Sequence, residues 1–204
     1  MTPAIPSGKL VLLRHGETEW SKSGQHTGRT DLPLTAQGEL VAKAAARLLA
    51  DHDFALVLAS PLQRAWRTAE LAGLAPQVEE NLIEWDYGGY EGRTTKDIRA
   101  ELGYDWSVFT DGVVAGESEG ETVEEVAARA SKVLARIAPA LADGDVALVG
   151  HGHALRVLAT VFLRQEPRLG AQLLLDAGSV SVLRYDKEFP AISSWNRVPE
   201  VSRD

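Results

Sequence analysis

Short apolar runs followed by polar residues constrain the fold of this chain more than any other feature. Three of them read LVLL, FALVLAS and DVALVG, at residues 10–13, 54–60 and 145–150. A run of about four to eight apolar residues is typical of a strand that is buried on both faces. Each run precedes a segment with helical periodicity, and alternating strands and helices predict a mostly parallel sheet with helices on both faces. The expected fold is an α/β three-layer sandwich, with residues 1–204 as a single domain.

Capping patterns place the helices between these strands. Thr35 precedes a helical pattern, and Thr122 with Glu125 matches the sequence of a capping box. Ser60 followed by Pro61 predicts a helix that begins at the proline. The other expected elements are helices at 95–102 and 153–163, a strand at 179–185 and an edge strand at 191–198.

Composition narrows the function. The 204 residues carry a formal net charge of −8, which argues against nucleic acid or an anionic membrane as the main partner. The chain has no cysteine, which excludes disulfides, thiolate catalysis and cysteine-ligated metals. The N-terminus lacks a signal-peptide pattern, and no apolar run approaches the roughly 20 residues that span a bilayer, so we expect a cytoplasmic protein.

Cations and imidazoles follow the predicted strands at the point where each strand ends. Arg14 and His15 follow the first run, Arg64 lies in the first turn of the helix after the second, and His151 follows the third. The carboxyl ends of parallel strands meet at one edge of a sheet, where ligands of such folds bind. Arginine pairs with two phosphate oxygens at once, so the pattern predicts an anion site that contains two histidines.

Each of these residues also has an ordinary explanation. A single histidine after a strand is more often a hydrogen-bonded structural residue, and Arg64 alone would be a solvated helix cation. His151 and His153 in GHGH could instead hold a metal, although no carboxylate lies nearby in the sequence. The nucleotide-binding patterns G-x-x-x-x-G-K-[ST] and G-x-G-x-x-G after a strand are absent, as is the nucleophile elbow G-x-S-x-G.

The segments LVLLRHGETEW, TGRTDLPLTAQGE, SPLQRAWRTAE, EWDYGGYEG and GHGHALR occur in the order seen in the histidine phosphatase superfamily, whose fold is called phosphoglycerate-mutase-like. The resemblance covers the chain from Leu10 to about Tyr185. It implies a single α/β domain, which agrees with the elements predicted above. It also implies an enzyme that hydrolyses phosphomonoesters and needs neither a metal nor another cofactor.

The resemblance assigns a role to each matching residue. His15 corresponds to the nucleophile of Arg-His-Gly, and Glu84 to the proton donor of Glu-x-x-Tyr-Gly. Phosphate contacts correspond to Arg14, Arg64 and His151 with Gly152 beside it, and to Thr27. Ser21 stands where the family usually has asparagine and is a weaker match, because its hydroxyl reaches less far. Asp86 and Glu17 are the competing candidates for the acid.

These roles form a consistent phosphoryl transfer. A neutral imidazole is a competent nucleophile near pH 7, and the phosphoryl group would move to His15 as a phosphohistidine. Arg14, Arg64 and His151 would act as three cationic groups around the phosphate oxygens. Glu84 would protonate the leaving alkoxide and then activate water.

Phosphatase is favoured over mutase, because the segment 95–116 lacks the arginine pair of the cofactor-dependent mutases and carries only Arg99. The motifs are most similar to the branch that includes sedoheptulose-1,7-bisphosphatase and related sugar-phosphate and acid phosphatases. Candidate cations for a second phosphate are Lys22, His26, Arg29, Arg93 and Lys96. Trp106 and Phe109 are either pocket walls or local core, and Asp176 either binds a sugar hydroxyl or closes a turn.

A phosphate-binding module without catalysis is the alternative from another class, and it would be marked by loss of the nucleophile or the acid. His15 and Glu84 are both present, which ranks it low. The expected partner is a small-molecule phosphomonoester, and neither nucleic acid nor a membrane is expected. The sequence leaves the oligomeric state open, with a homo-oligomer as one alternative.

Overall fold

A six-stranded sheet forms the centre of the computed structural model, which describes residues 5–201. The strand order is β3-β2-β4-β1-β5-β6. The strands β1 to β4 pair in parallel, and β5 and β6 are antiparallel additions at one edge. The mostly parallel α/β fold predicted from the sequence is therefore confirmed. The bounds are β1 Leu10–Arg14, β2 Phe54–Ala59, β3 Gln77–Val78, β4 Asp145–Gly150, β5 Val180–Asp186 and β6 Phe189–Arg197.

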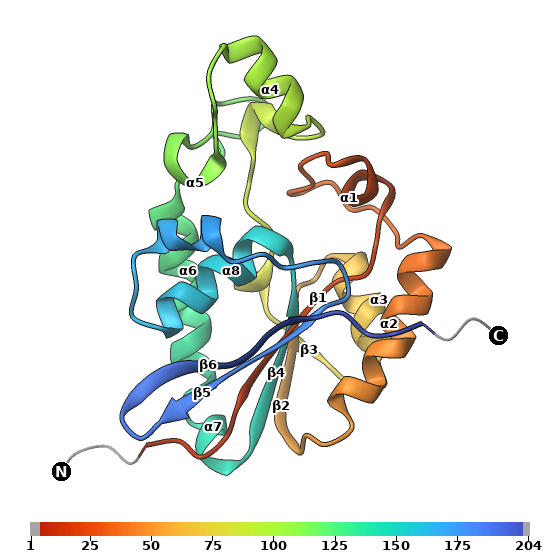
Figure 1. The fold of residues 1–204 in the computed structure, drawn as a ribbon, viewed down its shortest axis with the longest axis vertical. Helices are drawn as coiled ribbons and strands as arrows, with labels where there is room; N and C mark the ends of the chain where they lie inside the picture. Colours follow the sequence, from red (N-terminus) through yellow and green to blue (C-terminus); the bar gives the residue numbers. More distant parts are fainter. Residues whose placement is uncertain (1–4, 202–204) are drawn as a thin grey trace.

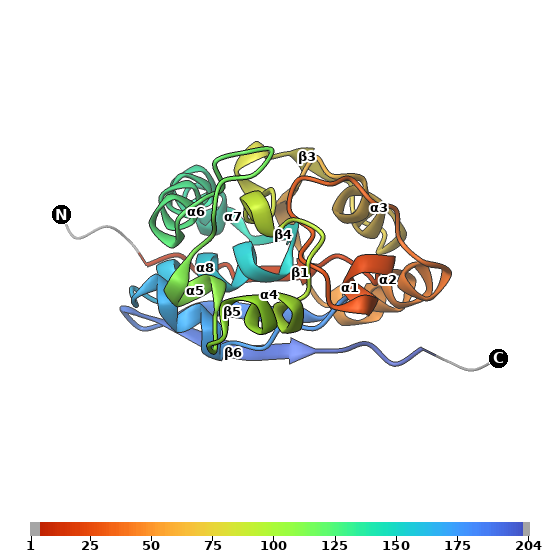
Figure 2. The same cartoon turned by 90° about the horizontal axis from the view of Figure 1, so that it is seen from above.

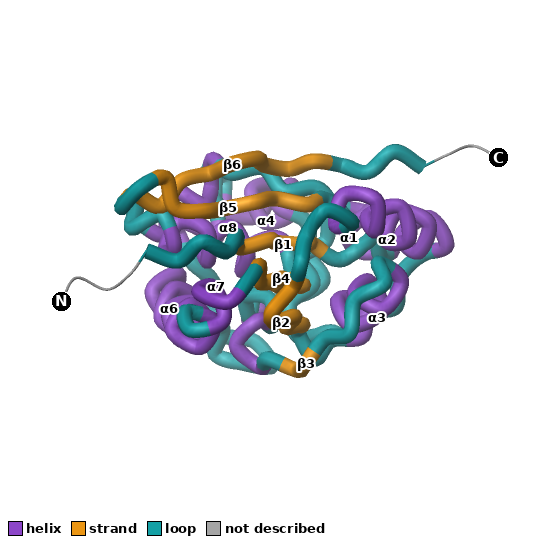
Figure 3. The backbone as a smooth tube through the Cα atoms, turned by 90° about the horizontal axis from the view of Figure 1, so that it is seen from below, coloured by secondary structure: helices purple, strands orange, loops and turns teal. Residues whose placement is uncertain are grey.

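Helices cover both faces of the sheet (Figures 1 and 3), with α2 and α3 on one side and α6 and α8 on the other. None of the helices within residues 5–201 has the length and hydrophobicity to cross a bilayer. The α-helices are α1 Glu19–Ser23, α2 Ala36–Leu49, α3 Gln63–Leu71, α4 Thr95–Leu102, α5 Val108–Asp111, α6 Val123–Ile137, α7 Ala140–Asp143 and α8 Gly152–Phe162. Short 3-10 helices are η1 Glu80–Leu82, η2 Gly88–Tyr90 and η3 Pro167–Gln172.

The central strand β1 is buried on both faces, as its uninterrupted apolar run predicts. Leu10 and Leu12 belong to the core under α6 and α8, whereas Val11 and Leu13 belong to the core under α2 and α3. All four side chains are fully buried. Because successive residues of a strand point to opposite faces, one short run contributes to two cores. Both cores hold β1 rigidly and thereby fix the residues at its carboxyl end.

Two of the predicted helix starts are confirmed and one is wrong. Thr35 caps α2 by accepting a hydrogen bond from Gly38 N, and Thr122 forms a reciprocal capping box with Glu125 at α6. The helix predicted to begin at Pro61 begins at Gln63 instead. The reason is that Leu62 is still extended, with φ −68° and ψ 133°, and stands at the N-cap in place of Ser60.

The carboxyl ends of β1, β2 and β4 lie beneath a roof of short helices and loops (Figures 1 and 2), to which α1, α4 and α5 belong. An isolated bridge between Gln25 and Thr94 joins the loop after α1 to the start of α4. The two-residue strand β3 has no counterpart in the sequence prediction, because Gln77 and Val78 are exposed and show no apolar run.

Candidate active site

The strand register brings the two histidines together. Arg14 is the last residue of β1 and pairs with Gly150, the last residue of β4. The next residue, His15, continues the ladder, because its N–H donates to Gly150 O at 2.9 Å. His151 then caps α8, and its ring centroid lies 5.1 Å from that of His15. The predicted meeting of both imidazoles at one sheet edge is thus observed.

The tautomer of His15 follows from one hydrogen bond. Its Nδ1 lies 2.7 Å from the carbonyl oxygen of Gly16, which can only accept, so Nδ1 carries the proton. Nε2 is therefore left with its lone pair. Burial, with the nearby charges of Arg64 and Arg14, lowers the pKa of His15 well below its ordinary value. The imidazole is neutral and nucleophilic at Nε2 near pH 7.

His151 is held in the opposite tautomer. The guanidinium of Arg64 donates from Nε to Nδ1 of His151 at 3.1 Å, so Nε2 carries the proton and donates to Ser60 Oγ at 2.8 Å. Burial, Arg64 and His15 lower the pKa of His151 well below its ordinary value. His151 is therefore neutral, and the sequence-based expectation that it acts as a cation is corrected.

The same geometry bears on the metal alternative for His151 and His153. Both ring nitrogens of His151 already have hydrogen-bond partners, so neither is free to bind an ion without breaking one of those bonds. Within residues 5–201, no three side chains of His, Asp or Glu gather in a way that could hold a metal.

Arg64 is fully buried and tied to the loop before α2. Its Nη1 donates to Thr30 O at 2.8 Å, and its Nη2 donates to Thr27 O and Gly28 O at 3.1 and 2.9 Å. Burial lowers the pKa of Arg64 from its ordinary value, and the carboxylate of Glu84 opposes that shift. The guanidinium keeps its charge and orients both His151 and the loop 27–30.

Arg14 lies against the start of α8. It donates from Nη1 to Leu175 O, whereas its buried Nε–H has no hydrogen-bond partner among the described residues. A Cβ on Gly152 would lie 3.3 Å from both Cζ and Nε of Arg14, so glycine gives the guanidinium room at this helix end. A buried, unpaired donor of a charged group is costly unless an anion satisfies it.

Glu84 approaches the same helix end from the opposite wall. Its Oε1 accepts from the backbone N–H of Trp85 and Ala154 at 2.9 and 2.8 Å, and its Oε2 accepts from His153 N at 3.0 Å. The side chain is buried. The two donors in the first turn of α8 favour a carboxyl group there. Oε2 keeps one lone pair free for a proton.

A cavity of about 230 Å³ opens onto these groups. It is lined by Arg14, His15, Ser21, Gly24, Gln25, His26, Thr27, Glu84, Tyr87, Thr95, Gly152, His153, Arg156 and Leu175. Of the residues expected to contact substrate, Arg64 and His151 do not line it, since both are fully buried. His151 lies beside His15, and Arg64 is bonded to the carbonyls of the loop 27–30.

The two hydroxyl groups expected at the phosphate are partly engaged elsewhere. Ser21 Oγ accepts from Thr18 N, which makes Ser21 the N3 partner of Thr18 in the capping box of α1, and it donates to Thr18 O. Thr27 Oγ1 donates to Gln25 O at 3.2 Å. Both side chains line the cavity, but Ser21 must give up its bond to Thr18 O before it can donate to an anion.

The far part of the cavity has a cation that the sequence analysis missed. Arg156 lines it, and its Nε and Nη2 are held by Gly170 O and Ala171 O at 2.7 and 2.9 Å. Of the five cations proposed for a second phosphate, only His26 lines the cavity. Burial lowers the pKa of His26 to about 4, so that side chain is neutral. The motif GHGHALR contains Arg156, but a helix arginine alone carries no signal of this kind.

The remaining sequence candidates lie outside the cavity. Asp86 accepts from Arg29, Ser118 and Gly88, and Glu17 accepts from Thr35 Oγ1, so neither competing acid reaches the site. Asp176 is exposed and bonds to Asn196 while its carbonyl closes a turn to Ser179. Trp106 and Phe109 are buried in an aromatic core with Trp85 and Tyr90. They also line a smaller cavity that shares His26, Thr95, His153 and Arg156 with the one beside His15, so they are both local core and pocket wall.

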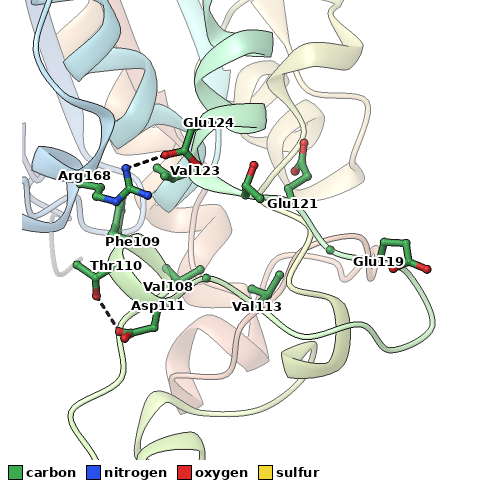
Figure 4. A pocket seen from close by; sticks show the side chains of 13 residues that line it. Val108, Phe109, Thr110, Asp111, Val113, Glu119, Glu121, Val123, Glu124 and Arg168 are labelled. Atoms are coloured by element: carbon green, nitrogen blue, oxygen red, sulfur yellow. Dashed lines mark hydrogen bonds and ion pairs between the residues drawn. The ribbon is translucent and has the colours of Figure 1, made fainter.

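A second cavity, of about 270 Å³, lies between α5 and the start of α6 (Figure 4). Its walls carry the carboxylates of Asp111, Glu119, Glu121 and Glu124. Its one cation, Arg168, pairs with Glu124 at 2.7 Å. Such a surface repels anions, so the cavity beside His15 is the better phosphate site.

Comparison with known proteins agrees with this geometry. The model of the histidine phosphatase superfamily (branch 1) matches residues 10–198. The chain belongs to this superfamily. An acid phosphatase of Mycobacterium tuberculosis is 40% identical over 185 residues, which is 89% of each chain. The sedoheptulose 1,7-bisphosphatase of Saccharomyces cerevisiae is 34% identical over 185 residues, covering 76% of this chain and 67% of the yeast protein.

A solved structure has the same fold. It is that of an open reading frame of Mycobacterium tuberculosis, with 35% sequence identity and a TM-score of 0.88 over 94% of this chain and 98% of that chain. The likeness extends over the strands and helices that build the cavity, because it covers nearly the whole chain.

Proposed function

We propose that this histidine phosphatase hydrolyses a small phosphomonoester, a sugar phosphate or sugar bisphosphate, through a phosphohistidine on His15. The observation that carries the proposal is the tautomer of His15. Its Nδ1–H is bonded to Gly16 O, so Nε2 keeps its lone pair, and His15 lines the cavity. Next to it stands the unpaired Nε–H of Arg14, a donor suited to a phosphate oxygen.

The reaction proceeds in two displacements. Nε2 of His15 forms a bond to phosphorus while the bond from phosphorus to the ester oxygen breaks, and Glu84 gives a proton to that leaving oxygen. In the second step, Glu84 takes a proton from a water molecule whose oxygen displaces His15 from phosphorus. Inorganic phosphate and the starting protonation state result, so no external acid, base or redox partner is consumed.

Charge stabilisation comes from two arginines and neutral donors. Arg14 binds the phosphoryl oxygens directly, and the hydroxyl groups of Thr27 and Ser21 add contacts at the rim. Arg64 and His151 act from behind, where Arg64 supplies a buried positive charge and orients the loop 27–30. Fixed donors of this kind favour the charge that develops during transfer.

The far part of the cavity supports a polar substrate with a second anionic group. Arg156 provides a charge there, and Thr95, His26 and His153 provide neutral hydrogen-bonding groups. The names of the acid phosphatase and sedoheptulose 1,7-bisphosphatase relatives agree with this class of substrate. We further infer a cytoplasmic enzyme, and both that location and a homo-oligomeric state stay predictions.

A mutase would return the phosphoryl group from His15 to the substrate instead of to water. Arg99, the single arginine in the segment 95–116, donates to Trp106 O at 2.8 Å and faces Asp105. It is therefore unsuited to hold a transferred substrate. Product analysis with 3-phosphoglycerate separates the two activities, because a phosphatase releases inorganic phosphate and a mutase releases an isomer.

The proposal is tested by trapping the intermediate. Wild-type protein quenched during turnover of a ³²P-labelled ester should carry label on His15, and His15→Ala should lose both the label and nearly all turnover. His52→Gln is the matched control, because His52 is a partly buried histidine that bonds to Asp145 far from the cavity. Substantial turnover by a pure, folded His15→Ala preparation would refute the mechanism.

A further inference from the structure

Glu84 lies in a stretch without regular structure, between η1 and η2. A general acid must be held close to its working position, and displacement by about 1 Å can cost on the order of 10²-fold in rate. The contacts to Trp85, His153 and Ala154 fix the carboxyl group itself. The backbone that carries it needs its own support, and that support comes from α6 and from Glu121, just ahead of that helix.

Arg129 of α6 holds the backbone on one side of Glu84. Its Nη1 donates to Ile83 O at 2.6 Å and to Asn81 O at 2.9 Å. Ile83 is the residue directly before Glu84, so the guanidinium fixes the peptide from which the acid extends. Arg129 does not line the cavity beside His15 and cannot contact a substrate there.

Glu121 holds the other side. Its Oε2 accepts from Asp86 N at 2.9 Å, its backbone N–H donates to Asp86 O at 2.9 Å, and its carbonyl accepts from the indole of Trp85 at 2.7 Å. These contacts involve the two residues that follow Glu84. The loop is therefore gripped both before and after the carboxyl group.

Arg129 and Glu121 are also bonded to each other. Arg129 donates from Nε to Glu121 Oε1 at 2.9 Å and from Nη2 to Oε2 at 3.2 Å, a bidentate pair. The side chains are 11% and 16% exposed, so water screens the pair little. The guanidinium binds the carboxylate with Nε and Nη2 and the two backbone carbonyls with Nη1. Lysine has no planar group that could make these contacts together.

We propose that Arg129 and Glu121 form a clamp that positions Glu84 for proton transfer, and that they are positioning residues rather than catalytic ones. This inference rests on the proposed role of Glu84. Its distinguishing consequence is selectivity in the first step: a loosened clamp slows phosphoryl transfer most from esters whose leaving group needs the proton of Glu84. General damage to the fold would slow every substrate alike.

The test uses the full chain with Arg129→Lys and, as a second route, Glu121→Gln. We measure the first phosphoryl-transfer step by rapid quench with β-glycerol phosphate, whose alkoxide leaves poorly, and with p-nitrophenyl phosphate, whose phenolate leaves easily. Each clamp variant should slow the first substrate by about 10–100-fold and the second much less. In a Glu84→Gln background, Arg129→Lys should add no further loss with β-glycerol phosphate.

Arg136→Lys is the matched control. Arg136 lies on the same helix and pairs with Glu79, ahead of η1, so it grips the chain without touching the residues beside Glu84. It should leave both rates near the wild-type values. Affinity for inorganic phosphate should also be unchanged in the clamp variants, because Arg14 makes that contact.

Two results would overturn the inference in different ways. If Glu84→Gln is selective for β-glycerol phosphate but Arg129→Lys slows both substrates alike, or adds loss in the Glu84→Gln background, the clamp fails and the acid role stands. If Glu84→Gln itself slows both substrates alike in the first step, the acid role fails and the clamp with it.

Discussion

Replacing Glu84 by glutamine removes the transferable proton and changes little else in size. The hydrogen bonds decide how the amide lies. Its single carbonyl oxygen must take the place of Oε1, where it accepts from both Trp85 N and Ala154 N. The NH₂ group then faces the N–H of His153, donor against donor. An unsatisfied buried donor costs about 1–3 kcal/mol, so the folded state should lose that much stability.

That loss should lower the unfolding temperature by roughly 2–12 °C, given about 2–4 °C for each kcal/mol in a chain of this size. The catalytic loss is separate and larger. Hydrolysis of an alkyl phosphate should fall by about 10²–10⁴-fold, the usual contribution of a positioned acid. With p-nitrophenyl phosphate the first step should slow far less. Hydrolysis of the phosphohistidine still suffers, so a burst of nitrophenolate should precede slow turnover.

Stopped-flow absorbance at the wavelength of nitrophenolate measures the burst, and rapid quench measures the alkyl phosphate. Glu17→Gln serves as the control, because Glu17 does not line the cavity and its carboxylate accepts from Thr35, and it should show neither effect. Equal losses for the two esters in the first step would refute the role assigned to Glu84. Asp86 would then be the next acid to replace, despite its present bonds to Arg29 and Ser118.

Other perturbations give distinct outcomes. Burial keeps His15 and His151 neutral in the folded state, whereas unfolded histidines bind protons below a pH of about 6.5. The free energy of unfolding measured with urea should therefore decrease as the pH is lowered below that value. The acid limb of the pH profile of kcat/KM should likewise lie below pH 6.5, and a limb at the ordinary histidine pKa would contradict a neutral, buried His15. Arg156→Gln should raise KM for sugar bisphosphates about tenfold more than for monophosphates, and equal shifts would exclude the second-anion contact. Gly38→Ala places a Cβ 2.2 Å from Glu17 O and should cost several kcal/mol in thermal unfolding. Exhaustive chelation should leave turnover unchanged, and loss restored by a metal would favour a metal mechanism.

Strand ends and helix caps could be predicted from the sequence because they depend on near neighbours. The run before Arg14 and the capping box at Thr122 are local patterns, and the structure reproduces both. Parallel pairing then brings His15 beside His151 with no further information. The start of α3 was missed because Leu62 stays extended, which the local Ser-Pro pattern does not reveal.

Charge and orientation within the site could not be predicted from residue types. Motifs suggest His151 as a cation, but its charge depends on burial and on Arg64, which occupies Nδ1. Arg156 resembles a solvated helix cation until η3 is seen to supply two carbonyls that hold its guanidinium. Both properties arise from side chains that meet only after the whole chain has folded.

The backbone hydrogen bonds of β4 also set the positions of residues in the active site. Its last two carbonyls bind the first residue beyond each neighbouring strand: Gly150 O holds His15, and Val149 O holds Ser60. Inserting one residue in β1 would shift His15 along the strand by about 3.3 Å and turn its side chain to the other face. The distance between the two imidazoles therefore depends on the lengths of the strands. Changes in the roof would alter the lining of the cavity, whereas a change in the length of β1 or β4 would separate the two imidazoles.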